Sequence, residues 1–137
     1  MMLVLSTLLH GLGMYFVHAR FDRHWPEFEH RRVGRQFFFG GLIFLILVVH
    51  LMEVLMWAIT LVALDAIRNF RDAFYYAAVT YTTLGYNAEM LPPHWRILAP
   101  MIAMSGLFAF GWTTGVLVSM VHRMHERDRD RDPRRSP

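Results

Sequence analysis

The sequence of 137 residues contains no cysteine, so disulfide bonds and thiolate metal sites are excluded. Charged residues make up only 18% of the chain, against 55% hydrophobic ones, and they gather in clusters between long apolar runs. The chain also lacks a phosphate-binding glycine loop, an internal repeat and any motif of a soluble enzyme. The clustered charges and long apolar runs are typical of a membrane protein. Because no enzyme motif is present, we expect the protein not to be an enzyme.

Three apolar segments are long enough to cross a bilayer, which takes about 20 helical residues. The first covers residues 1–17 and predicts an N-terminal helix over residues 1–19. No positively charged segment precedes it and no Ala-x-Ala site follows it, so we expect a retained helix rather than a signal peptide, with an interfacial helix or a processed segment as alternatives. The other two spans are residues 37–64 and roughly 95–121.

The net charge of +3 comes mainly from two arginine-rich segments, a connector at residues 20–36 and a tail at residues 123–137. Both are mixed with acidic residues and flank apolar spans, so they indicate cytoplasmic flanks and not a nucleic-acid surface. The expected protein is therefore a multi-pass protein of the inner membrane, with its N-terminus outside and its C-terminus in the cytoplasm.

We expect the connector to be a solvated loop, because Pro26 should break a helix there. Its aromatic residues Phe21, Trp25 and Phe28 are candidates for anchoring it at the membrane interface. We expect a solvated tail, with tetramer sensing or lipid contact as the alternative.

A fourth segment, residues 73–82, is apolar but too short to span a membrane. It suits a re-entrant half-helix, with Asp72 capping its positive end. Residues 80–87 follow with the sequence Thr-Tyr-Thr-Thr-Leu-Gly-Tyr-Asn. Selectivity filters need rings of backbone carbonyls, and Gly85 permits the left-handed backbone that turns successive carbonyls toward one axis.

This stretch resembles the pore signature of potassium channels, Thr-Val-Gly-Tyr-Gly, with Leu84 in place of Val and Asn87 in place of the second Gly. The similarity covers roughly residues 72–121 and places Gly106 at the usual hinge of the inner helix. The sequences His-Leu-Met-Glu at residues 50–53 and Phe-Gly-Trp at residues 110–112 are similar to a family of small bacterial ion channels related to potassium channels.

The resemblance implies an all-α membrane protein with three transmembrane helices, a re-entrant pore helix and a selectivity-filter loop. It implies that residues 37–122 form the pore domain and that the chain assembles as a homotetramer. It implies no cofactor other than K+ or Na+ ions, and the change at Asn87 leaves the choice between them open. The implied ion-coordinating residues are Thr83, Leu84, Gly85, Tyr86 and Asn87, with K+ at the first four. The implied cavity or gate residues are Gly106, Phe110 and Thr114.

Two other functions compete with the channel. The eight His and ten Met residues suggest a membrane redox or metal-binding subunit as one alternative. The change at Asn87 suggests a non-conducting scaffold or sensor with a pore-like fold as the other. The hydroxyl of Thr114 also has two interpretations, because it can face a water-filled cavity or bond back to its own helix.

An intramembrane polar cluster is predicted from His10, His50 and Glu53. His50 and Glu53 are three residues apart on one helix face, and His10 falls at a similar depth if the first two spans are antiparallel. A carboxylate at this depth needs a partner. A hydrogen-bonded packing lock, a protonation switch and a bound cation are the three alternatives.

Overall fold

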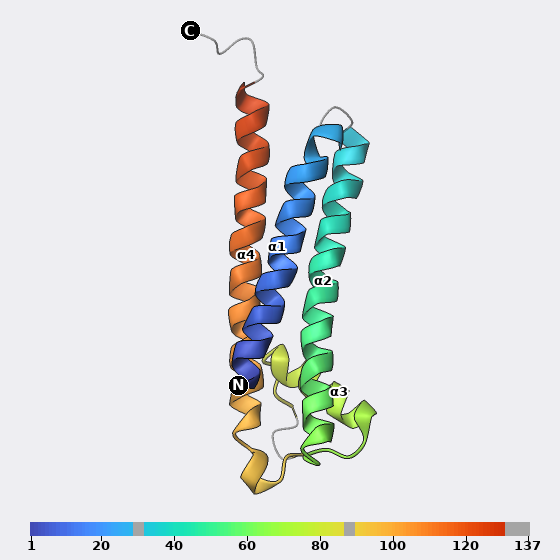
Figure 1. Cartoon of the computed structure of the whole chain (residues 1–137), viewed down its shortest axis with the longest axis vertical. Helices are drawn as coiled ribbons and strands as arrows, with labels where there is room; N and C mark the ends of the chain where they lie inside the picture. Colours follow the sequence, from blue (N-terminus) through green and yellow to red (C-terminus); the bar gives the residue numbers. More distant parts are fainter. Residues whose placement is uncertain (29–31, 87–89, 131–137) are drawn as a thin grey trace.

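The computed structural model describes residues 1–28, 32–86 and 90–130 of the chain. Its helices are α1 (Met2–Phe28), α2 (Arg32–Ala63), α3 (Phe70–Tyr81) and α4 (Leu98–Asp130), and a 3-10 turn at Pro93–Trp95 precedes α4. The three long helices run side by side, with α1 and α2 antiparallel and α4 alongside them (Figure 1). The described residues contain no strand, so the predicted all-α class is confirmed.

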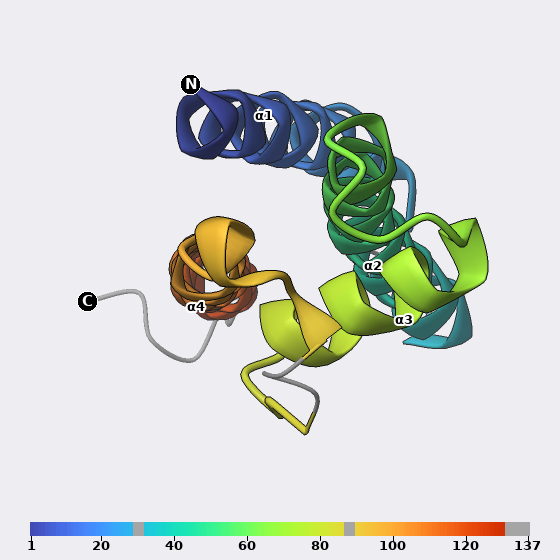
Figure 2. The ribbon, with the colours of Figure 1, turned by 90° about the horizontal axis from the view of Figure 1, so that it is seen from below.

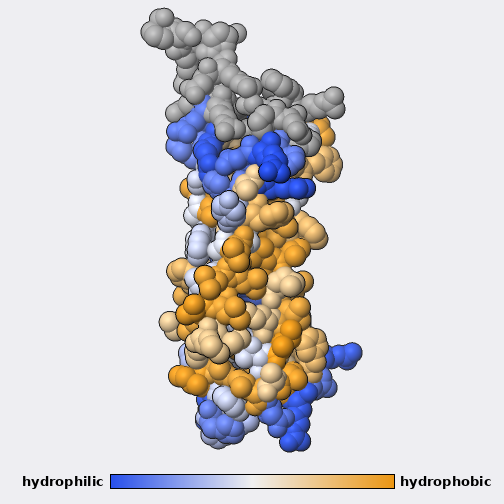
Figure 3. All heavy atoms as spheres, viewed as in Figure 1, coloured by the Kyte–Doolittle hydropathy of each residue, from blue (hydrophilic) through white to orange (hydrophobic). Residues whose placement is uncertain are grey.

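Three helical segments are long and apolar enough to cross a membrane: Met2–His24, Val33–Ala63 and Pro93–Glu126. They contain 23, 31 and 34 residues, so the second and third must tilt or project beyond a hydrocarbon core about 30 Å thick. In Figure 3 apolar residues cover the middle of the visible face, while hydrophilic residues lie toward both ends. The molecule is therefore built as a membrane protein.

The arginine-rich connector is not the loop that Pro26 predicted. Helix α1 continues through Pro26 to Phe28, and α2 begins at Arg32. Pro26 lies in the last turn of α1, so the hydrogen bond that it cannot donate to the carbonyl four residues earlier is lost only at the end of the helix. Phe21 is also no membrane anchor, because it is fully buried in the core. For Trp25 and Phe28 the structure describes the helical backbone alone, so their anchoring role stays a prediction.

Helix α3 begins three residues earlier than predicted. Its N-cap is Asn69, whose side chain accepts a hydrogen bond of 2.9 Å from the backbone N–H of Arg71. Asp72 lies inside the first turn instead, where its charge still favours the positive helix end. With 12 residues, α3 is about 18 Å long and cannot span the membrane; it lies across one end of the bundle between α2 and α4 (Figure 2).

Two apolar clusters form the core. One surrounds α3 and includes Trp57, Tyr76 and Ile102, and the other joins α1, α2 and α4 around Phe21 and Met120. The first cluster also carries a polar tie between helices, because Trp57 Nε1–H donates to Ser105 Oγ at 3.0 Å. On α1, α2 and α4, buried polar residues lie between the parts of the helix that belong to these two clusters: His10, His50, Glu53 and Thr113.

The two arginine-rich segments end up at the same end of the molecule. The C-terminal end of α1, the start of α2 and the C-terminal end of α4 lie at the top of Figure 1, opposite α3. Arg123 of α4 makes an ion pair of 3.4 Å with Asp22 of α1 there.

Candidate functional site

The loop that follows α3 lies on the surface of the single chain. Residues 82–86 are all exposed. As predicted, Gly85 has a left-handed backbone, with φ of +69°. Thr83 is also left-handed, with φ of +61°, which is uncommon for a β-branched residue and was not predicted. Asn87, the outermost predicted filter residue, lies outside the described residues.

The loop turns its N–H groups toward α3. The N–H of Thr83 donates to Thr80 O at 3.0 Å, and the N–H groups of Leu84 and Gly85 donate to Val79 O at 2.9 and 3.2 Å. These bonds satisfy the last carbonyls of α3, as helix ends require. The hydroxyl of Thr82 bonds back to Ala78 O at 2.9 Å.

The backbone carbonyls of the same loop differ from its N–H groups. Among the residues that the structure describes, none donates a hydrogen bond to the backbone carbonyls of residues 82–86. Backbone carbonyls without a donor are possible oxygen ligands for a cation. The nearby C-terminal end of α3 adds the negative end of a helix dipole.

Gly106 brings α4 into contact with the base of this loop. A Cβ atom at Gly106 would lie 1.9 Å from the backbone oxygen of Tyr81, the last residue of α3. Helix α4 runs without interruption from Leu98 to Asp130, so Gly106 is a point of close approach within a continuous helix. Its hinge role remains a prediction.

The other two predicted cavity residues face different surroundings. Phe110 is 42% exposed, and its ring stacks on that of His50 at a centroid distance of 4.5 Å. Thr114 is exposed and its hydroxyl donates to Phe110 O at 2.8 Å. Of the two interpretations of Thr114, the bond to its own helix is therefore present in the single chain.

The structure brings His10, His50 and Glu53 together. One ligand atom from each lies within 4.8 Å of the others, and all three side chains are buried. His10 Nδ1 lies 3.5 Å from Glu53 Oε1, and His50 Nδ1 lies 3.9 Å from Glu53 Oε2. Helix α1 thus contributes directly to the buried polar cluster on α2.

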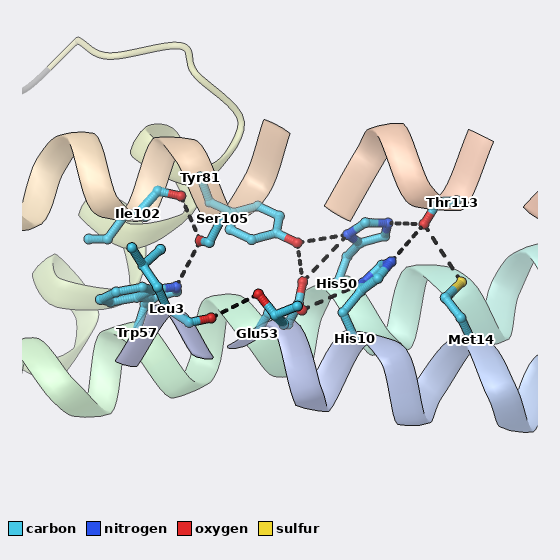
Figure 4. A network of polar contacts seen from close by, with 11 residues as sticks. Leu3, His10, Met14, His50, Glu53, Trp57, Tyr81, Ile102, Ser105 and Thr113 are labelled. Atoms are coloured by element: carbon cyan, nitrogen blue, oxygen red, sulfur yellow. Dashed lines mark hydrogen bonds and ion pairs between the residues drawn. The ribbon is translucent and has the colours of Figure 1, made fainter. Parts of the chain in front are cut away.

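Two further residues join the cluster, and the sequence did not single them out. The hydroxyl of Tyr81 donates to Glu53 Oε2 and lies 2.8 Å from His50 Nδ1. Thr113 Oγ1 lies 3.1 Å from His50 Nε2 and 3.3 Å from His10 Nε2. The five side chains, from α1, α2, α3 and α4, form the closed polar ring shown in Figure 4.

Aromatic and small residues enclose this polar ring. The ring of Trp112 lies 5.6 Å from that of His10, and Gly11 leaves room for it, since a Cβ there would lie 3.2 Å from Trp112. Phe110 covers His50. With these covers the polar ring is shielded from lipid and solvent, so its hydrogen bonds must be satisfied internally.

Comparison with known proteins finds a family model that matches most of the chain. A family model described as ion channel matches residues 37–123, which run from α2 through most of α4. No curated protein and no solved structure matches the chain significantly. The match covers the exposed loop and four of the five residues of the polar ring; His10 lies before it.

Proposed function

The chain belongs to this ion-channel family, and from that premise we propose that it forms a homotetrameric pore-loop cation channel that conducts potassium. The observation that carries the proposal is the loop after α3. Among the described residues its backbone carbonyls accept no hydrogen bond, whereas the N–H groups of Thr83, Leu84 and Gly85 are bonded to α3. Carbonyl oxygens without a donor are available to coordinate cations.

The tetramer follows from what one chain lacks. A ring of carbonyls needs several copies around an axis, and a loop left facing lipid would leave polar backbone groups unsatisfied. Large apolar side chains are also exposed on and near the loop and on the adjoining part of α4: Leu84, Tyr86, Met104, Leu107 and Phe108. Neighbouring copies would cover both the loop and this face, and the resemblance to potassium channels gives four as their number.

The proposed ion path uses the carbonyls of Thr83, Leu84, Gly85 and Tyr86, with Asn87 at the outer mouth. Monovalent cations are the transported species, and potassium is favoured by the resemblance of residues 82–86 to the potassium-channel signature. Phe110 and Thr114 lie on the exposed side of α4, where they would line the inner cavity of a tetramer.

The orientation we propose places the arginine-rich end in the cytoplasm of an inner-membrane protein. It is supported by the common end of the molecule at which the end of α1, the start of α2 and the end of α4 lie, and by the excess of arginine on cytoplasmic flanks. The filter loop then opens to the outside.

Potassium flux into liposomes that contain the purified protein tests the proposal. Gly85→Ala should abolish flux, because a Cβ disfavours the left-handed backbone at this position. Gly40→Ala is the matched control, since nothing lies within 4 Å of a Cβ there and flux should be unchanged. Both proteins should give tetramers by native mass measurement.

Two results would overturn the proposal. Normal flux in Gly85→Ala would remove the loop from the ion path. An intact wild-type tetramer without flux would favour the non-conducting scaffold or sensor instead.

A further inference from the structure

Every contact in the polar ring joins two atoms that can share one proton. Going around it, Glu53 contacts His10, His10 contacts Thr113, and Thr113 contacts His50. His50 then contacts Tyr81, and Tyr81 returns to Glu53. Apart from the longer contact of 3.9 Å between His50 Nδ1 and Glu53 Oε2, the ring therefore has five contacts and needs five protons to satisfy all of them.

The five side chains bring only four protons in their ordinary states. The hydroxyls of Tyr81 and Thr113 supply one each, and each neutral imidazole supplies one. An ionised Glu53 supplies none. One contact is therefore left without a proton unless the ring binds another.

The hydrogen-bond directions locate that contact. Because the Tyr81 hydroxyl donates to Glu53 Oε2, it must accept from the N–H at Nδ1 of His50. His50 Nε2 then accepts from the Thr113 hydroxyl, which in turn accepts from the N–H at Nε2 of His10. The remaining contact joins His10 Nδ1 and Glu53 Oε1, and these are two buried atoms without a hydrogen-bond partner.

We propose that the polar ring binds a fifth proton at neutral pH, shared between His10 Nδ1 and Glu53 Oε1. With it the ring carries no net charge, which an apolar membrane interior favours. Without it, a carboxylate oxygen and an imidazole lone pair face each other at 3.5 Å, and both are left unsatisfied at a cost.

A proton fits these atoms better than a metal ion. His10, His50 and Glu53 offer a possible ligand set, but zinc takes at least three protein ligands. His50 Nδ1 and Glu53 Oε2 already contact the Tyr81 hydroxyl. The two atoms without a partner are too few to form a metal site.

The groups that face this proton come from all four helices. His10 lies on α1, His50 and Glu53 on α2, Tyr81 on α3 and Thr113 on α4. The described contacts of these side chains include no other ionisable group. The remaining neighbours are the rings of Phe110 and Trp112 and the thioether of Met14, 3.8 Å from Thr113 Oγ1.

The bound proton holds α1 to the rest of the bundle at this depth. Losing it turns the direct link between His10 and Glu53 from a hydrogen bond into a repulsive contact. Tyr81 ends α3 immediately before the exposed loop, so the change reaches the base of the loop. Only this last consequence rests on the proposed function; the proton site stands apart from conduction.

Unfolding of the purified protein, in whatever oligomeric state it adopts, is measured against pH without any ion flux and tests the proton site. Per chain, the folded wild type should hold about one proton more than the unfolded protein near pH 8, where free histidine and glutamate side chains have released theirs. Its unfolding equilibrium constant, expressed per chain, should therefore rise about tenfold per pH unit there. Glu53→Gln should flatten this rise, because its amide N–H₂ donates to His10 Nδ1 at every pH while its oxygen accepts from Tyr81.

Glu126→Gln is the matched control, since Glu126 is exposed on α4 and pairs only with His122 among the described residues; it should keep the wild-type rise. A flat wild-type profile, or parallel profiles for wild type and Glu53→Gln, would overturn the proposal. The wild-type profile decides alone if Glu53→Gln fails to assemble. Zinc chloride that stabilises the wild type but not Glu53→Gln would also overturn it, in favour of a metal site.

Discussion

Replacing Gly106 by alanine tests the contact between α4 and the base of the exposed loop. The new Cβ would lie 1.9 Å from Tyr81 O and 2.8 Å from Tyr81 C. Real Cβ atoms do not come closer than about 3.0 Å, so α4 and the end of α3 must separate by about 1.1 Å, the difference between 3.0 and 1.9 Å. Both obstructing atoms belong to the backbone, which cannot move aside as a flexible side chain can.

The cost has two parts. Overpacking a tight contact costs about 1–3 kcal/mol. Moving Tyr81 also strains its hydroxyl contacts with Glu53 and His50, each worth about 1 kcal/mol or more. We expect a total of about 2–4 kcal/mol per chain from these terms, which a tetramer would pay in every copy.

The assay is tetramer stability in detergent, followed by native mass and by resistance to SDS. Gly106→Ala should weaken or abolish the tetramer, whereas Gly40→Ala should not, because nothing surrounds that position. A residue that acts only as a hinge would leave assembly intact and change gating alone. Wild-type stability in Gly106→Ala would therefore refute the close packing of α3 on α4.

Two other substitutions follow from the structure and the sequence. Ser105→Ala removes the acceptor of the Trp57 indole N–H at 3.0 Å, and leaving that buried donor unpaired should lower the free energy of unfolding by about 1–3 kcal/mol in an SDS titration; an unchanged midpoint would contradict this hydrogen bond. Asn87→Gly should raise the preference for potassium over sodium, because it restores the glycine of the potassium-channel signature; an unchanged bi-ionic reversal potential would show that Asn87 adopts the same backbone state as glycine.

Much of the fold was predictable because the membrane simplifies the problem. Long apolar runs identify spans by length alone, and the three spans appear as three helices of membrane length. The errors fell in the polar segments between them. Pro26 was given too much weight as a helix breaker, and Asp72 was preferred over Asn69 as the cap, although a side chain at either position has the required acceptor.

The polar ring was predictable only in part, for a geometric reason. Antiparallel neighbours of known depth bring His10 level with His50 and Glu53, so these three follow from counting residues. Tyr81 and Thr113 depend on how α3 and α4 are rotated about their own axes. Hydropathy does not determine that rotation when apolar residues occupy nearly every face. Tyr81 was also interpreted only as part of the filter-like sequence at residues 80–87, so its side chain was not considered as a partner of Glu53.

Tyr81 is the residue that makes the two candidate sites one system. Its backbone oxygen marks where α4 touches α3 at Gly106, and its hydroxyl completes the polar ring with Glu53 and His50. The next residue begins the exposed loop. Since His10 belongs to the same ring, hydrogen-bonded contacts link α1 to the last residue of α3 before the loop.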